Sequence, residues 1–181
     1  MYNVRKLKRK KRAFMKVLGN NSLSSKVLIG LKFVVIVTVI AMIFIASVLI
    51  KNIRDVALYG NQKLEETIII SGVFIAGFVF IAMLMKLIKF FKNLKYSKCF
   101  EEENTKLLKD ISMLILIGSI IYCLIAILQI IFSDNYISII VYNSFLWILT
   151  VIMFCLSVGM KIFIEIYKKA IEFKKENDFT I

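Results

Sequence analysis

Four long stretches without a charged side chain most constrain what this chain can fold into. They cover residues 33–50, 67–85, 111–133 and 135–160. A helix needs about 20 apolar residues to cross the hydrocarbon layer of a bilayer. In that layer the backbone must satisfy its own hydrogen bonds, so only helices and closed barrels can cross it. The stretches have the length of membrane-spanning helices. We predict four spans, at about residues 28–50, 67–88, 108–133 and 136–165.

Composition supports lipid as the surrounding medium. Hydrophobic residues make up 60% of the 181 positions, and a single soluble domain of this size could not hide so many apolar side chains from water. A barrel would show short segments of alternating polarity, which residues 33–50 lack. We therefore predict an all-α integral membrane four-helix bundle over residues 27–181, preceded by a basic tail over residues 1–26.

Basic residues predict the orientation of the bundle. All lysines and arginines except Lys51, Arg54 and Lys63 lie in the N-terminal tail, at the start of span one (Lys32), around the connection between spans two and three, or at and after the end of span four. Because cytoplasmic flanks carry an excess of Lys and Arg, we expect both termini to be cytosolic in a protein of the cell membrane. The tail 1–26 directly precedes a span, which favours contact with anionic lipid headgroups over direct nucleic-acid binding.

The chain lacks the residues that most enzyme sites need. It contains no histidine, which excludes a histidine-based triad. Its three cysteines form no C-x-x-C pair, and the four uncharged stretches hold no Asp or Glu, which proton-coupled transport usually requires. We therefore expect neither an enzyme nor a cofactor or metal.

Two amides within the spans, Gln129 and Asn143, are the candidate intramembrane polar contacts. They could line a site for a solute or ion. Alternatively, they form interhelical hydrogen bonds, which are worth about 0.6 kcal/mol on average. The second reading is favoured.

Two segments predicted to be cytosolic resemble a known family. Phe100, Asn104, Leu108 and Ile111 match a Phe-x-x-x-Asn-x-x-x-Leu-x-x-Ile signature that opens the third span in a bacterial four-span membrane protein family, catalogued as domain of unknown function 2975. The ending resembles the tail of that family at Glu176, Asn177, Asp178, Thr180 and Ile181. The likeness covers roughly residues 28–181. The chain departs from the family at two positions. The family often has proline before the phenylalanine, where this chain has Cys99, and it often has glycine at the position of Ala170.

The resemblance implies a function only by association, because the family has no established activity. Its members are often encoded beside a small helix-turn-helix regulator. We therefore expect a membrane-embedded regulatory or interaction protein that works with a cytosolic helix-turn-helix transcription regulator. The candidate partner-binding residues are Phe100, Asn104, Leu108, Glu176, Asn177, Asp178 and Thr180.

Two other functions stay open from the sequence. One is a small transporter or channel subunit that acts as a homo-oligomer, with Gln129, Asn143 and Thr150 along its path. The other is an immunity or stress-protection protein of the membrane, which would have the same sequence features.

Overall fold

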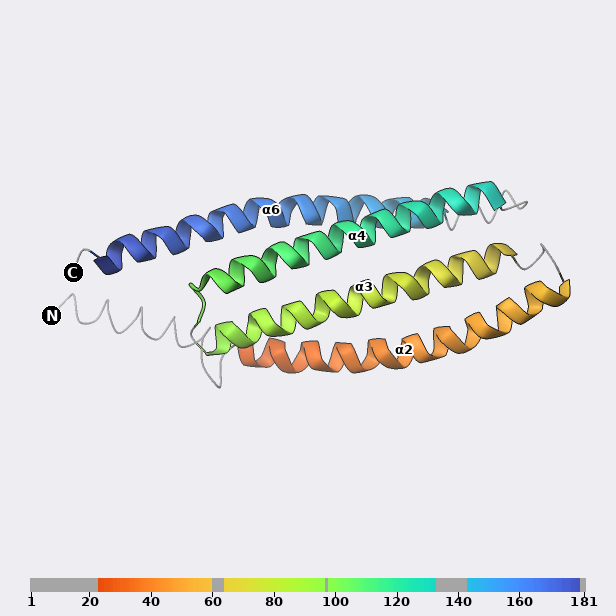
Figure 1. Cartoon of the computed structure of the whole chain (residues 1–181), viewed down its shortest axis with the longest axis horizontal. Helices are drawn as coiled ribbons and strands as arrows, with labels where there is room; N and C mark the ends of the chain where they lie inside the picture. The colour runs from red at the N-terminus through yellow and green to blue at the C-terminus, as the bar shows by residue number, and fades with distance from the viewer. Residues whose placement is uncertain (1–22, 60–63, 97, 133–142, 180–181) are drawn as a thin grey trace.

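The computed structural model describes residues 23–59, 64–96, 98–132 and 143–179 as four helices and the connection between the second and third (Figure 1). Most of the predicted tail 1–26, the turn between the last two spans and Thr180 lie outside the described residues. The helices are α2 (Leu23–Tyr59), α3 (Leu64–Lys95), α4 (Glu102–Phe132) and α6 (Ser144–Phe179).

Each helix is long and apolar enough to cross a membrane. The helices contain 37, 32, 31 and 36 residues in chain order, so at about 1.5 Å per residue even the shortest exceeds the hydrocarbon layer of about 30 Å. The predictions of an all-α fold over the described residues and of a multi-pass membrane protein are confirmed. The helices extend past the uncharged stretches because their Lys- and Glu-rich flanks are also good helix formers.

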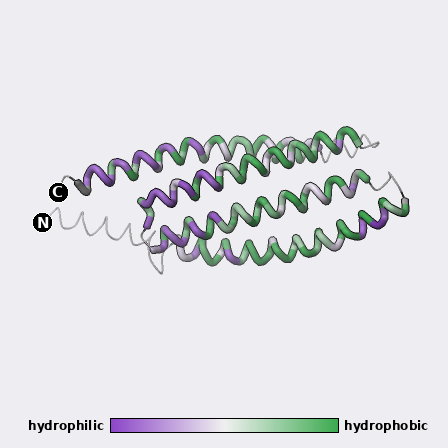
Figure 2. Tube along the Cα trace, viewed as in Figure 1, coloured by the Kyte–Doolittle hydropathy of each residue, from purple (hydrophilic) through white to green (hydrophobic). Residues whose placement is uncertain are grey.

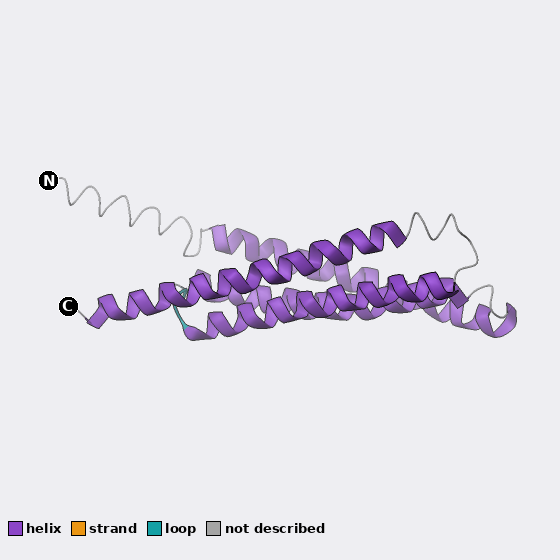
Figure 3. Ribbon diagram, turned by 90° about the horizontal axis from the view of Figure 1, so that it is seen from above, coloured by secondary structure: helices purple, strands orange, loops and turns teal. Residues whose placement is uncertain are grey.

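The helices are antiparallel neighbours that pack in chain order (Figures 1 and 3). The packed pairs are α2 with α3, α3 with α4, and α4 with α6. Helix α4 is the most enclosed, since 39% of its most apolar window is buried, whereas the corresponding window of α2 is only 6% buried. The outer faces of α2 and α6 expose large apolar side chains such as Phe44 and Ile148, which suits contact with lipid.

Small residues allow the helices to approach closely. A Cβ built at Gly72 of α3 would lie 2.4 Å from Cγ1 of Ile125 on α4, and one at Gly77 would lie 2.1 Å from Sδ of Met42 on α2. Ala126 on α4 is fully buried. In membranes, where burying apolar surface drives helix association little, such close packing is a main source of stability.

Polar residues gather at one end of the bundle. Figure 2 shows them where α3 ends, α4 begins and α6 ends. The start of α2 lies at this same end (Figure 1). The clustering follows from the sequence, because charged flanks must leave the hydrocarbon layer.

Candidate functional site

The polar end, which we define as residues 86–110 and 161–179, contains the segments predicted to bind a partner. The end of α3, the connection at 98–101 and the start of α4 lie beside the C-terminal half of α6, whose last turns extend past them (Figure 1). The structure thus brings the two segments that resemble the family into one region of the molecule.

Asn104 joins three parts of the polar end. Its side chain is completely buried. Its Nδ2 donates to the backbone oxygen of Lys98 at 2.6 Å and lies 3.5 Å from the hydroxyl of Tyr167 on α6. Its Oδ1 accepts a hydrogen bond of 2.8 Å from Nδ2 of Asn93 on α3. Asn104 therefore ties the connection, α3 and α6 together from the first turns of α4.

Tyr167 completes this network. Its hydroxyl donates to the backbone oxygen of Cys99. Burial raises the pKa of Tyr167, so the phenol, which is already protonated at neutral pH, stays a donor to still higher pH. Sequence reasoning missed Tyr167 and Asn93, because the contacts that give them a role join residues as far as 68 positions apart.

An apolar cluster lies beneath the network. Phe90, Leu107, Leu108 and Ile164 are buried together, from α3, α4 and α6. The rings of Phe90 and Tyr167 meet edge to face with centroids 6.4 Å apart. The cluster packs the charged helix ends against one another just outside the uncharged stretches.

Asn104 and Leu108 are interior residues in this structure. Leu108 is 3% exposed and Asn104 is not exposed at all, so neither offers a surface to a partner, which differs from the role predicted for them. The Phe-x-x-x-Asn-x-x-x-Leu pattern instead describes how α4 begins and packs. Phe100 is half-buried, and Nζ of Lys174 lies 5.2 Å from its ring centre, so α6 covers the connection.

The other predicted partner-binding residues lie on the last turns of α6 or beyond. Glu176 and Asn177 are exposed. Asp178 belongs to α6, but its side chain and the whole of Thr180 lie outside the described residues. The end of α6 is therefore the accessible part of the predicted surface.

Among the described residues of the polar end, three ion pairs link one helix to another. Nζ of Lys86 lies 2.6 Å from Asp110, Lys89 lies 2.7 Å from Glu103, and Lys175 lies 2.6 Å from Glu102. A hydrogen bond from Lys175 and its charge hold the pKa of Glu102 below its ordinary value, and Lys89 does the same for Glu103. All six groups are partly exposed, so the pairs position the helix ends more than they stabilise them.

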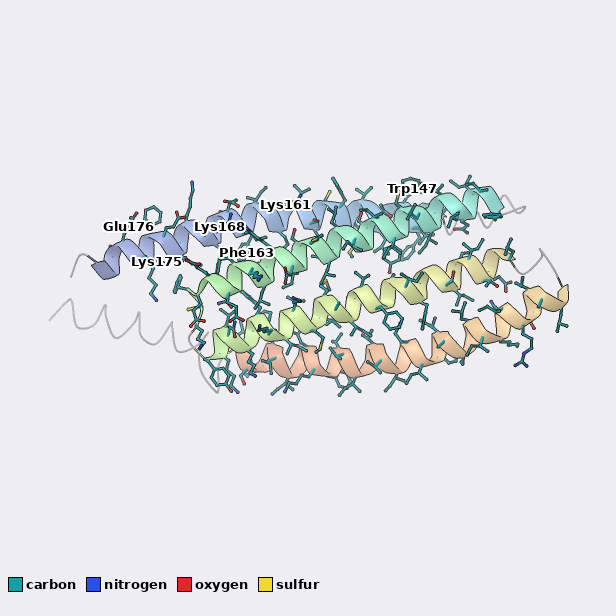
Figure 4. All side chains as sticks on the ribbon, in the orientation of Figure 1. Trp147, Lys161, Phe163, Lys168, Lys175 and Glu176 are labelled. Carbon is teal, nitrogen blue, oxygen red and sulfur yellow. The ribbon has the colours of Figure 1, made fainter. Side chains whose placement is uncertain are left out.

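A polar groove runs between α4 and α6. It has a volume of about 730 Å3, and its lining residues are Glu102, Glu103, Thr105, Lys106, Lys109, Lys168, Ile171, Glu172 and Lys175. Sequence reasoning missed it, although a signal exists. Lys161, Lys168 and Lys175 are spaced by seven residues, which places them on one face of a helix. Figure 4 shows these lysines in order along α6 towards its C-terminal end.

The two amides within the spans differ from the predicted hydrogen-bonding pair. Gln129 is 1% exposed, and neither atom of its amide group has a hydrogen-bond partner. Asn143 is 5% exposed, and its Oδ1 is likewise unpaired. Among the described residues of the lipid-crossing part, the hydrogen bonds between α4 and α6 come from serines, Ser112 with Ser157 and Ser119 with the backbone of Thr150.

Comparison with known proteins gives one finding. No match to the chain is found among curated proteins or among solved structures. A family model, described as "Protein of unknown function (DUF2975)", matches residues 33–181, which include all of α3, α4 and α6 and most of α2. The resemblance stated from the residues at the start of α4 and the end of α6 is therefore confirmed, and the chain belongs to the DUF2975 family of proteins of unknown function.

Proposed function

We propose that this chain is a non-catalytic interaction protein of the cell membrane, whose polar end faces the cytosol and holds a soluble protein partner. The partner is a small helix-turn-helix transcription regulator, the kind of protein that the family resemblance implies. The chain would keep the regulator at the membrane and release it when the packing of the helix ends changes.

The orientation is supported by the placement of basic residues. Lysines are frequent at the end of α3 and in the last turns of α6. The basic residues of the described helices at the opposite end are only Lys51 and Arg54. Cytosolic flanks carry such an excess because positive residues are retained on that side during insertion. The polar end is the cytosolic end in this proposal.

The observation that carries the proposal is the length of α6 beyond its uncharged stretch. Residues 161–179 stay helical, which extends the helix by about 28 Å. The headgroup layer on one side takes up only about 5–8 Å of this length. α4 begins only nine residues before its own uncharged stretch, about 14 Å. The last turns of α6 therefore project past the other helices.

The projecting turns have the character of a binding surface. Phe173 is 63% exposed although it lies far outside the lipid-crossing stretch and among charged residues. Exposed aromatic rings are frequent anchors in protein interfaces. Ion pairing of Lys175 with Glu102 connects this surface to the start of α4, so a shift between α4 and α6 would move it.

Site-specific photocrosslinking in cells tests the proposal. A photoreactive amino acid at Phe173 should crosslink the full chain to a co-expressed helix-turn-helix regulator encoded beside the gene. The same group at Ile148, exposed on the lipid-crossing part of α6, is the matched control. Equal crosslinking at both positions, or no adduct at Phe173 with the regulator present, would refute the proposal. A reporter fused after Ile181 that is active only outside the cytosol would refute the orientation.

A second candidate function, a small oligomeric transporter or channel subunit, is favoured by one observation. Gln129 is buried within the lipid-crossing part of α4 with both amide atoms unpaired, and such a group is costly unless something binds it. Flux of small solutes or ions into proteoliposomes that is lost in Gln129→Leu would favour this function over the first. Absence of flux in the unmodified protein would remove it.

A further inference from the structure

The polar groove between α4 and α6 is built from both helices on the side of the polar end. Thr105, Lys106 and Lys109 line it from α4, and Lys168, Ile171 and Lys175 line it from α6. Three glutamates also border it. The groove is a candidate binding site, and its charges, its one buried hydroxyl and its continuation towards the membrane indicate what would bind.

The glutamates are largely neutralised by lysines. Glu102 pairs with Lys175, and Glu103 pairs with Lys89, which lies outside the groove. Lys168 pairs with Glu165, also outside it. Among the described residues the lining holds four lysines and three glutamates. The charge of Lys109 also acts on Glu165 outside the groove. The lining itself therefore keeps a small positive surplus. It suits an anionic group that two lysines can approach.

Thr105 adds an unused hydrogen-bond donor. The residue is 8% exposed, and its Oγ1 is buried without a hydrogen-bond partner. An unpaired buried hydroxyl is unfavourable, and an oxygen of a bound anion would satisfy it. Thr105 also lies in the first turn of α4, a helix of 31 residues, where the dipole favours negative charge.

The groove continues into an apolar one. Lys109 also lines a second groove of about 260 Å3, together with Lys161, Ser112, Met113, Leu116 and Ile164. Lys109 and Lys161 lie at the ends of the uncharged stretches of α4 and α6, which is the level of the lipid headgroups. The polar groove followed by the apolar groove matches a lipid molecule, which has a charged headgroup and apolar acyl chains. A free anion would need only the polar groove.

We propose that the groove between α4 and α6 binds an anionic phospholipid, with its phosphate between Lys106, Lys109 and the hydroxyl of Thr105, and an acyl chain along Met113 and Leu116. This site goes beyond the proposed function and does not depend on a protein partner. It also differs from a general attraction of basic residues to the membrane surface, because specific side chains hold the phosphate.

Native mass spectrometry of the full chain, released from bilayer nanodiscs of phosphatidylglycerol and phosphatidylcholine, tests the proposal. The unmodified protein should retain phosphatidylglycerol in preference to phosphatidylcholine. The double variant K106Q/K109Q should lose this preference by about tenfold or more, because each basic side chain contributes substantially to headgroup binding. The double variant K92Q/K169Q removes the same charge from exposed lysines outside the groove and should retain the lipid.

Three results would overturn the proposal. Equal loss in the two double variants would mean that only overall charge matters. An unchanged preference in K106Q/K109Q would place the lipid elsewhere. Displacement of phosphatidylglycerol by inorganic phosphate alone would identify a free-anion site. Thr105→Val, which keeps the shape of the side chain but removes the hydroxyl, should weaken retention without changing the helical circular dichroism, and full retention in this variant would contradict the role of the hydroxyl.

Discussion

Ser112 of α4 and Ser157 of α6 exchange hydrogen bonds across the helix interface. Oγ of Ser112 donates to the backbone oxygen of Ser157 at 3.1 Å, and Oγ of Ser157 donates to that of Ser112 at 3.0 Å. Both residues are buried. Backbone atoms of two helices come within reach of one short side chain only where the helices are very close, so this pair marks a close approach of α4 and α6.

Removing this exchange should weaken the bundle by a modest and measurable amount. Ser157→Ala should lower the free energy of unfolding in mixed micelles by about 0.6 kcal/mol, and the double substitution with Ser112→Ala by about 1 kcal/mol. Ser71→Ala is the matched control, since the hydroxyl of Ser71 bonds to Ile68 within its own helix. A control as destabilised as Ser157→Ala would show that contact between helices is not the cause.

Gly72 should tolerate no side chain while Ile125 is present. An added Cβ would lie 2.4 Å and 2.5 Å from Cγ1 and Cδ1 of Ile125, so Gly72→Ala should destabilise the protein by about 1–3 kcal/mol through overpacking. In an Ile125→Ala background the same substitution should be nearly harmless. Gly159→Ala, where no heavy atom lies within 4 Å, should be neutral. Equal penalties for Gly72→Ala in both backgrounds, measured by thermal unfolding, would contradict the packing described.

Asn104 and Tyr167 should be energetically coupled. Asn104→Ala removes the acceptor of the 2.8 Å hydrogen bond from Asn93, which keeps only a bond of 3.4 Å to Glu103, and removes the donor to the backbone oxygen of Lys98. Losing these part-buried bonds should cost about 1–3 kcal/mol. Tyr167→Phe removes the donor to Cys99. Since both side chains bind the same connection, the double variant should lose less stability than the sum of the two single losses. Additive losses in a double-mutant cycle would mean that the two residues act separately.

The attachment of α6 to the start of α4 should weaken in acid. The pKa of Glu102 is lowered in the folded protein by its hydrogen bond to Lys175. The stabilising contribution of the ionised Glu102 carboxylate is therefore fully present above its ordinary pKa of about 4.3 and is lost as the pH falls through the lowered pKa. The distribution of distances between spin labels at Tyr96 and Glu172 should broaden as the pH falls through this range.

Two substitutions identify the group responsible. Glu102→Gln should show the broadened distances already at neutral pH, with little further change in acid. Glu176→Gln should respond to pH as the unmodified chain does. A Glu102→Gln variant with the full pH response would assign the effect to another carboxylate.

The sequence by itself determined that the chain forms four helices fit to cross a membrane, and it identified the family. Uncharged stretches such as residues 67–85 require helices because the backbone has no other partner for its hydrogen bonds in lipid. The same argument places lysines and glutamates outside the stretches and so predicts where a polar end must be.

Only the tertiary structure decided which face of each helix meets another. Lipid tails are about as apolar as leucine, so hydrophobicity does not distinguish a lipid-facing side chain from a packed one. The positions of Gly72 against Ile125 and of Ser112 against Ser157 therefore had no clear signal in the pattern. Asn104 and Leu108 were predicted to face a partner because they match the family signature, but a match in sequence does not tell which side of α4 is covered, and both residues are interior. The groove beside Lys109 exists only because α4 and α6 meet along those faces.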